Sequence, residues 1–138
     1  MAVGIIINNK NEVLISFRHK DKDQGALWEF PGGKKEGFES VESALKREFR
    51  EELNISLEEF SPLMRIKHRY DNKYVLLDVW IIKSFKGEPV GVEGQPIEWR
   101  SVKSLRCEDF PSANAKIIKT LQADQITKYD SAGNRYFD

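Results

Sequence analysis

The sequence lacks the features of an exported, membrane-spanning or strongly basic protein. Cys107 is the only cysteine among 138 residues, so no internal disulfide can form, and a cytoplasmic location is the simplest expectation. No apolar run approaches the ~20 residues of a membrane-spanning helix, and the N-terminus lacks the basic start of a signal peptide. Lysine plus arginine equals aspartate plus glutamate, at 22 each, which argues against a broad surface for nucleic-acid polymers. We therefore expect one domain over residues 1–138, without a membrane partner.

The most informative stretch is residues 33–55, GKKEGFESVESALKREFREELNI, which begins as a glycine-rich loop and continues as a helix. Ser40 is a suitable N-cap, and Asn54 suits the left-handed position that follows many helices. At about 100° per residue, the apolar residues form one stripe along this helix. The stripe, which we expect to face the core, consists of Val41, Ala44, Leu45, Phe49 and Leu53.

Three glutamates share this stripe: Glu48 and Glu52 lie in its middle and Glu51 at its edge. Carboxylates one helical turn apart repel each other, and partial burial makes the repulsion more costly. A divalent cation such as Mg²⁺ would relieve it, because hard cations bind carboxylate and phosphate oxygens. The competing interpretation is a solvated acidic face with salt-bridge partners at Lys46, Arg47 and Arg50. The position within the apolar stripe favours the metal site.

Hydrophobic patterning predicts strands at residues 2–7, 12–18, 28–30, 64–70, 74–85 and 97–102. The first two should pair as a hairpin across the turn at 8–11, and residues 57–63 should form a connection. The run 74–85 should be the central strand. Residues 112–122 should form a closing helix, and the tail 123–138 should be irregular and at most partly ordered.

Residues with binding chemistry also lie at predicted loop edges. Arg18 ends the strand 12–18, where a guanidinium can grip phosphate oxygens, although an ordinary surface arginine is the more frequent outcome. In the segment ALWEFPGGK, Glu29 alternates with two aromatic residues that suit a core or a pocket wall. The glycine pair that follows lets the backbone approach a ligand, and a carbonyl there could join a metal shell.

Three further polar residues have ordinary interpretations beside functional ones. Glu93 lies in the glycine- and proline-rich loop 87–96, a kind of loop that often carries function, yet its position alone suggests an exposed loop acid. Asn114 lies in the first turn of the closing helix, where amides often serve helix-start chemistry. Asp78 interrupts the strand 74–85, and we expect it on a half-exposed face rather than in a pocket.

The helix and its approach follow the pattern G-x5-E-x7-R-E-U-x-E-E-x-G-U, where U is a bulky apolar residue. This pattern resembles the Nudix box of the Nudix hydrolases, a specific signal because many positions are fixed over a fixed length. Two positions differ from the family: Asn54 replaces a glycine, and Phe38 stands before Glu39 where glycine is frequent. The fixed positions of the pattern fall on Gly33, Glu39, Arg47, Glu48, Phe49, Glu51, Glu52, Asn54 and Ile55.

Other segments extend the resemblance over residues 2–121. AVGII, WEFPGGK, GEPVGVEGQP and DFPSAN are similar to the MutT branch of this family, pyrophosphohydrolases that remove oxidised guanine nucleotides from the precursor pool. The resemblance implies an α/β fold, an α/β/α sandwich with a mixed sheet between the box helix and the C-terminal helix. It also implies that 8-oxo-dGTP is hydrolysed to 8-oxo-dGMP and pyrophosphate by attack at the β-phosphorus.

The resemblance also assigns roles to single residues. Arg47 would orient the box glutamates with Glu39 as its partner, and Glu48, Glu52 or Glu93 would take the proton of the attacking water. Mg²⁺, with Mn²⁺ as a substitute, would be held by Gly32, Glu48, Glu51, Glu52 and Glu93. The substrate-binding positions are Arg18, Glu29, Phe30, Tyr70, Lys73 and Asn114. Of these, Tyr70 and Lys73 differ from the residues expected at the pocket rim.

Two alternatives stay open. One is a Nudix pyrophosphohydrolase that acts on CTP or a modified pyrimidine nucleotide, although Asn114 favours a purine because its amide offers both a donor and an acceptor. The other is a non-catalytic Nudix module that binds a nucleotide, which would be expected to have lost box glutamates; all are present. We expect a small nucleotide as the partner and a monomer, with a dimer as the alternative.

Overall fold

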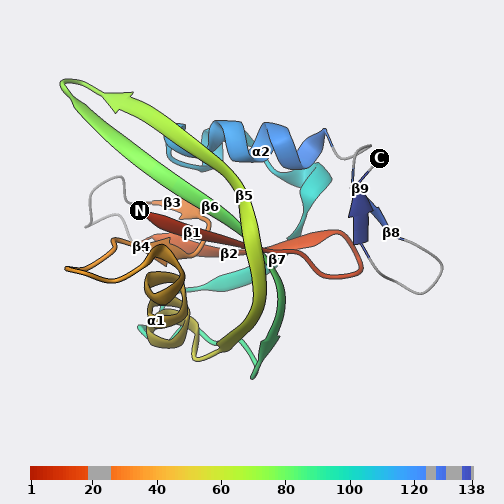
Figure 1. Ribbon diagram of the computed structural model, residues 1–138. Coiled ribbons are helices and arrows are strands. Elements are labelled where there is room, and N and C mark those ends of the chain that lie inside the picture. Colours follow the sequence, from red (N-terminus) through yellow and green to blue (C-terminus); the bar gives the residue numbers. More distant parts are fainter. Residues whose placement is uncertain (19–25, 124–126, 130–134, 138) are drawn as a thin grey trace.

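The computed structural model describes residues 1–18, 26–123, 127–129 and 135–137, and it is a mixed α/β structure (Figure 1). Helix α1 (Val41–Leu53) lies on one side of the strands and helix α2 (Ala115–Gln122) on the other. The predicted α/β/α arrangement is confirmed, but the strands between the helices form two sheets. No helix in the described ranges is long and apolar enough to cross a membrane.

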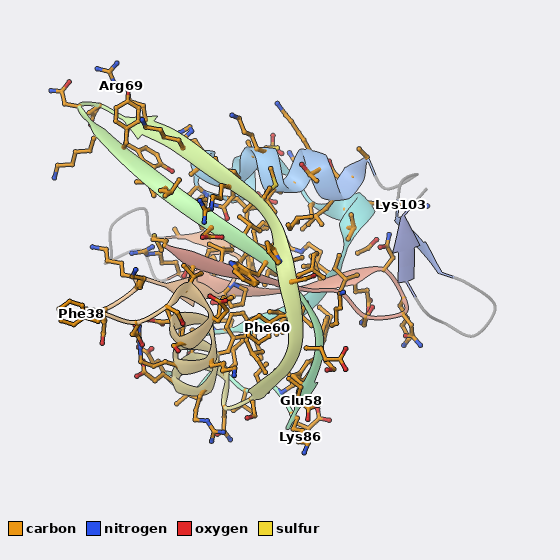
Figure 2. All side chains as sticks on the ribbon, in the orientation of Figure 1. Phe38, Glu58, Phe60, Arg69, Lys86 and Lys103 are labelled. Carbon is orange, nitrogen blue, oxygen red and sulfur yellow. The ribbon has the colours of Figure 1, made fainter. Side chains whose placement is uncertain are left out.

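The first sheet is mixed and has the strand order β4-β1-β6-β5. In it β1 runs parallel to β6, whereas the β1–β4 and β6–β5 pairs are antiparallel. Its strands are β1 (Ala2–Ile6), β4 (Gly32–Gly33), β5 (Ser56–Tyr70) and β6 (Lys73–Lys86). The prediction of an interior strand at 74–85 is therefore confirmed, since β6 lies between β1 and β5. The long β5–β6 hairpin projects beyond the rest of the fold, with Arg69 near its tip (Figure 2).

The second sheet is antiparallel, with the strand order β3-β2-β7. Its strands are β2 (Glu12–Arg18), β3 (Leu27–Glu29) and β7 (Ile97–Ser101). The predicted hairpin of the first two strands is wrong, because β1 and β2 lie in different sheets. Beside their connecting turn, Ile7 and Val13 form an isolated antiparallel bridge. All five residues of β1 are buried, so this strand needs neighbours on both edges, which β4 and β6 supply.

Three further segments differ from expectation. Residues 57–63 belong to β5, which lies at a sheet edge and contains register shifts around Pro62; an edge strand tolerates proline because its N–H need not pair. The closing helix begins as a 3₁₀ turn, η3 (Ser112–Asn114), preceded by η1 (Val102–Ser104) and η2 (Cys107–Asp109). In the tail, β8 (Thr127–Tyr129) pairs with β9 (Arg135–Phe137), whereas the predicted irregularity of residues 124–126, 130–134 and 138 lies outside the described residues.

The predicted limits and inward face of the box helix are confirmed. The Ser40 side chain accepts a hydrogen bond from the Ser43 N–H at 3.1 Å, and Asn54 ends the helix in the left-handed conformation with φ 55°. Ala44, Leu45, Phe49 and Leu53 are all buried in one core cluster under this helix. A second cluster contains Ile117, Ile118 and Leu121 of α2, so each helix covers its own apolar layer.

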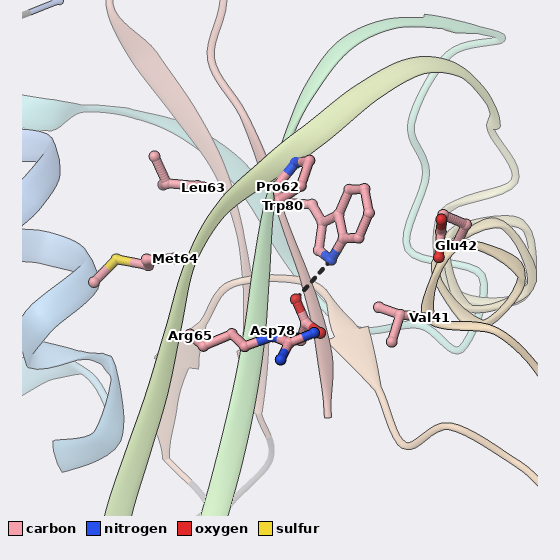
Figure 3. Close-up of a pocket in the computed structure, with 8 residues that line it drawn as sticks. All are labelled: Val41, Glu42, Pro62, Leu63, Met64, Arg65, Asp78 and Trp80. Atoms are coloured by element: carbon pink, nitrogen blue, oxygen red, sulfur yellow. Dashed lines mark hydrogen bonds and ion pairs between the residues drawn. The ribbon is translucent and has the colours of Figure 1, made fainter.

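Asp78 is buried, which corrects the prediction of a half-exposed face; its residue exposure is 9%. Its carboxylate accepts a hydrogen bond from the Trp80 indole at 2.9 Å and pairs with Arg65 at 3.4 Å. Both partners lie on the same face of the β5–β6 pair and line a cavity of about 380 Å³ (Figure 3). The cavity is lined by Val41, Glu42, Pro62, Leu63, Met64, Arg65, Asp78 and Trp80. None of the predicted site residues is among them.

Candidate active site

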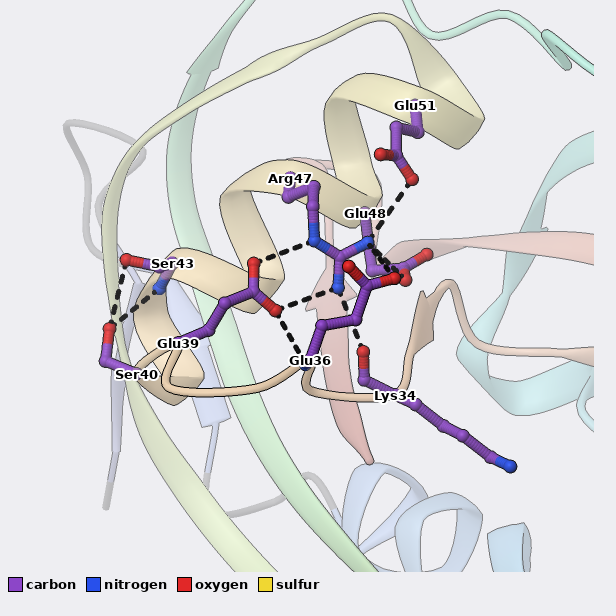
Figure 4. A network of polar contacts seen from close by, with 8 residues as sticks. All are labelled: Lys34, Glu36, Glu39, Ser40, Ser43, Arg47, Glu48 and Glu51. Atoms are coloured by element: carbon purple, nitrogen blue, oxygen red, sulfur yellow. Dashed lines mark hydrogen bonds and ion pairs between the residues drawn. The ribbon is translucent and has the colours of Figure 1, made fainter.

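Arg47 is the centre of a polar network between α1 and the loop that precedes it (Figure 4). Its guanidinium donates two hydrogen bonds to Glu39, from Nε at 2.8 Å and from Nη2 at 3.0 Å. Nη1 donates to Glu48 at 2.9 Å and to Glu51 at 3.3 Å. The hydrogen bond from Arg47 holds the pKa of Glu39 below its ordinary value, and Glu39 in turn raises the pKa of Arg47. The Arg47 side chain thus holds Glu39, Glu48 and Glu51 in place.

The loop before α1 accommodates the departure from the family pattern at Phe38. Gly37 adopts the left-handed conformation, with φ 49°, so glycine supplies the turn one residue earlier than the family pattern has it. The Phe38 side chain points into solvent (Figure 2). Glu39 still reaches Arg47, and its carboxylate also accepts a hydrogen bond from the Glu36 N–H at 2.8 Å.

Strand β4 brings the backbone against the helix glutamates. A Cβ on Gly33 would overlap the carboxylate of Glu48, and a Cβ on Gly32 would overlap the carbonyl oxygen of Ala2. Gly32 also has φ 154°, a conformation that L side chains rarely adopt. Glycine at both positions therefore lets β4 pair with β1 while leaving the space in which the Glu48 carboxylate lies.

Glu52 is the most strongly perturbed carboxylate near this strand. Burial and the neighbouring Glu48 raise the pKa of Glu52 to about 8, with further contributions from Glu29 and Glu93. Burial also raises the pKa of Glu29, against the opposing charge of Arg18. Acids from three segments of the chain, Glu48, Glu29 and Glu93, therefore lie close enough to Glu52 to oppose its ionisation. Such an excess of negative charge is the environment that a bound cation would stabilise.

The loop after β6 is docked on the C-terminal end of α1. The Val92 N–H and the Gln95 side-chain amide both donate to the Glu52 carbonyl at 3.0 Å. The Gln95 side-chain oxygen accepts from the Glu93 N–H at 2.9 Å. Gln95 thereby ties Glu93 to the helix that carries the other glutamates. Its role was not assigned from the sequence, although it lies in the EGQP segment that carried the resemblance.

The aromatic and amide candidates lie on the α2 side of the sheets. Phe30 is buried and stacks on Phe110 with ring centroids 5.2 Å apart. Tyr70 accepts a hydrogen bond from the Ala113 N–H at 3.0 Å. Asn114 follows directly, and its side chain makes no capping hydrogen bond in the described part of α2. The Asn114 side-chain amide is therefore not used to cap the helix. Phe110, which was not predicted as a site residue, stacks on the predicted residue Phe30.

Arg18, predicted to contact phosphate, and Lys73, predicted to lie at the pocket rim, are in different parts of the structure. Arg18 is paired with Glu29 at 3.3 Å, with both side chains one third exposed, so contact with a phosphate would require exchange of this partner. Lys73 is exposed at the start of β6, opposite Tyr70 in the β5–β6 register. The structure thus places Arg18 beside the acid cluster and Lys73 near the tip of the hairpin.

The donor set fits a hard divalent cation, because it consists of carboxylate oxygens beside a glycine backbone. Glycine at position 33 leaves room for the Glu48 carboxylate, which occupies the place that a Cβ would take. Among the described residues, no three acid, histidine or cysteine side chains already converge as a cage for a metal ion. Arg47 binds Glu48 and Glu51 in this structure, so these carboxylates would have to turn toward a metal.

In the presence of EDTA, the free energy of unfolding is expected to fall as the pH rises from about 4.5 to about 8. Below this window Glu52 is protonated in both the folded and the unfolded chain, so its burial carries little penalty. Above it the carboxylate is ionised in both states, and the folded chain bears the full cost of burying this charge beside Glu48. Urea denaturation at stepped pH measures the slope. Glu52→Gln should reduce the dependence of the free energy of unfolding on pH, and Glu42→Gln should leave it unchanged. An unchanged pH dependence in Glu52→Gln would contradict its assignment to Glu52.

Comparison with known proteins identifies the class to which this arrangement belongs. Residues 2–120 match the family model described as NUDIX domain. The match spans most of the 138 residues, so the chain belongs to the Nudix hydrolase family. The resemblance found in the box helix is thereby confirmed.

Comparison with individual members of the family shows which of its branches the chain resembles. The chain is 40% identical to the 8-oxo-dGTP diphosphatase of Escherichia coli (strain K12) over 122 residues, which is 88% of this chain and 95% of the relative. It is 34% identical to the CTP pyrophosphohydrolase of the same strain over 122 residues, 88% of this chain and 90% of that protein. A solved MutT structure, from a study of Aliivibrio salmonicida and Vibrio cholerae, matches with a TM-score of 0.75 at 35% identity, covering 89% of this chain and 95% of that one. The likeness to the MutT branch is therefore confirmed.

Proposed function

We propose that this protein is a Mg²⁺-dependent nucleoside triphosphate pyrophosphohydrolase that converts 8-oxo-dGTP to 8-oxo-dGMP and pyrophosphate. The observation that carries the proposal is the placement of Glu52, whose pKa is raised by burial and by Glu48, with further contributions from Glu29 and Glu93. The 40% identity to a protein named 8-oxo-dGTP diphosphatase supports the choice of substrate. In this role the enzyme removes an oxidised nucleotide before it can enter DNA.

The ligands proposed for Mg²⁺ are Gly32, Glu48, Glu51, Glu52 and Glu93, with Mn²⁺ as a substitute. Bound Mg²⁺ supplies neutralisation of the phosphates and a lowered pKa for a coordinated water. Arg47 holds Glu48 at 2.9 Å, so Glu48 would turn from Arg47 to serve as a ligand, and Glu52 or Glu93 would accept the proton of the water. The water oxygen attacks the β-phosphorus, the bond from this phosphorus to the α–β bridging oxygen breaks, and the nucleoside monophosphate leaves with that oxygen.

The base is proposed to bind beside the start of α2, at the turn that carries Asn114. Phe30 and Phe110 form an aromatic floor, and the half-buried Asn114 offers a donor and an acceptor to a purine edge. Arg18 would grip phosphate oxygens after leaving Glu29. Tyr70 and Lys73 border this region from the two strands of the hairpin.

A pyrimidine nucleotide such as CTP is the second candidate substrate. It is supported by the 34% identity to a protein named CTP pyrophosphohydrolase. The purine is favoured because the Asn114 amide is not engaged in capping within the described part of α2. We also propose that the enzyme acts as a cytoplasmic monomer on free nucleotides, since its single cysteine, Cys107, is an exposed thiol of the kind found in reducing compartments.

A panel of substrates tests the base preference. Pyrophosphate release with Mg²⁺ would be measured for 8-oxo-dGTP, dGTP, CTP, 5-methyl-dCTP and ADP-ribose. We expect the highest kcat/KM for 8-oxo-dGTP, and we expect Asn114→Ala to lose roughly tenfold or more of that preference, because a hydrogen-bonding site left unpaired discriminates strongly. If a pyrimidine nucleotide has the highest kcat/KM, the substrate assignment is wrong. If none is hydrolysed with Mg²⁺ or Mn²⁺, the catalytic assignment is wrong.

A further inference from the structure

Two side chains of β5 reach across to the turn that precedes α2. The Tyr70 hydroxyl accepts a hydrogen bond from the Ala113 N–H at 3.0 Å, and His68 Nε2 lies 3.1 Å from the Ser112 hydroxyl. The two rings also contact each other edge to face, with centroids 4.6 Å apart. These bonds join segments that are 43 and 44 residues apart in the chain.

The turn that they hold is η3, and its third residue is Asn114. Neither Pro111 nor Asn114 caps this region with a side-chain hydrogen bond in the described chain. The first N–H groups of a helix have no partner within the helix, and a 3₁₀ turn has poor hydrogen-bond geometry of its own. The Tyr70 hydroxyl therefore provides, from another element, a cap that the local sequence does not.

The position of Asn114 depends on this turn. Two of the three residues of η3 are bonded to β5, and Ala113 is buried at 4% exposure. The Asn114 N–H then donates to the Pro111 carbonyl at 2.9 Å. The backbone from which the Asn114 amide projects is thus fixed relative to β5 and to the Phe30–Phe110 pair.

We propose that His68 and Tyr70 are positioning residues that set base selectivity by holding the Ser112–Asn114 turn against β5. The proposal rests on the function proposed above, in which Asn114 contacts the base. Tyr70 then acts through Asn114 rather than by reading the base with its own hydroxyl, because that hydroxyl is engaged by the Ala113 N–H. His68 supports the same turn through Ser112.

A double-mutant cycle tests whether Tyr70 acts through Asn114. Tyr70→Phe keeps the ring and removes the acceptor, and we expect the ratio of kcat/KM for 8-oxo-dGTP to that for dGTP to fall roughly fivefold to tenfold, the effect of about one hydrogen bond. In the Asn114→Ala background the same change should alter the ratio less than twofold, because coupled residues are not additive. The matched control is Tyr74→Phe, an exposed tyrosine on the paired strand, which should leave the ratio unchanged. Equal effects of Tyr70→Phe in both backgrounds, or none in either, overturn the proposal.

Amide hydrogen exchange provides a readout that does not depend on the substrate. Exchange at Asn114 should accelerate in Tyr70→Phe and further in Tyr70→Phe/Ser112→Ala, while amides in the middle of α1 keep their rates. Unchanged exchange at Asn114 overturns the proposal even if base selectivity changes. If the wild type prefers a nucleotide other than 8-oxo-dGTP, the proposed function fails, whereas the exchange result still decides whether the turn is held by β5.

Discussion

Glu52→Gln is expected to lower kcat for pyrophosphate release by roughly 10²- to 10⁴-fold, the range for loss of a group that transfers a proton or supports the metal. The substitution keeps the size of the side chain and removes its charge. Glu52 is buried beside Glu48, and its pKa is raised to about 8 by burial and by that neighbour. Its negative charge is therefore unfavourable for folding, and we attribute its presence to catalysis. The folded chain should consequently be at least as stable after the change at neutral pH.

Glu42→Gln is the matched control, since it makes the same chemical change on the same helix. Glu42 is exposed in the first turn of α1 and lines the cavity near Asp78 instead of the acid cluster. Steady-state pyrophosphate release should remain within about twofold of wild type in this control, a range typical of surface changes away from a site. If the two variants retain similar activity, Glu52 is not part of the catalytic centre.

Gly33→Ala is expected to lower kcat/KM by roughly 10²-fold while the protein remains folded. The added Cβ would occupy the place of the Glu48 carboxylate, and a displacement of about 1 Å at a reacting group can cost that much. The cost to folding is small because the atoms in the way belong to the flexible end of a side chain. Thermal denaturation should therefore give a Tm within a few degrees of wild type, while the activity assay shows the loss.

The same change in a Glu48→Gln background separates this effect from a general disturbance of the loop. If Gly33→Ala acts by moving the Glu48 carboxylate, the double variant should be about as active as Glu48→Gln alone, because both changes remove one function. A further 10²-fold loss in the double variant would show that position 33 acts independently of Glu48.

The box helix could be predicted from sequence because its signals are local. The Ser40 cap, the left-handed Asn54 and the apolar stripe are each set by residues within a few turns. The prediction that Glu48 lies within the apolar stripe is also confirmed, since its side chain is only 13% exposed. The pairing of Arg47 with Glu39 was implied by the family pattern and is present at 2.8 Å.

The partners of the strands could not be predicted in the same way. Patterning identified β1 and β2 as strands, but their assignment to separate sheets depends on β6, a segment about 70 residues later. Likewise β5 extends through Pro62 because it lies at a sheet edge, a fact that no local window contains. The contacts of Gln95 with Glu52 and of Tyr70 with Ala113 also join segments far apart in the chain. These two contacts could not be predicted from the types of the residues involved.

Direct binding of Mn²⁺ to the nucleotide-free protein, followed by electron paramagnetic resonance at neutral pH, most directly tests whether the acid cluster is a metal site. The account predicts binding by wild type and by Glu42→Gln with equal affinity, and at least roughly tenfold weaker binding by Glu52→Gln, as expected when a ligand or its close support is lost. Equal affinity in all three proteins would contradict the account, because the metal would then be held elsewhere than beside Glu52.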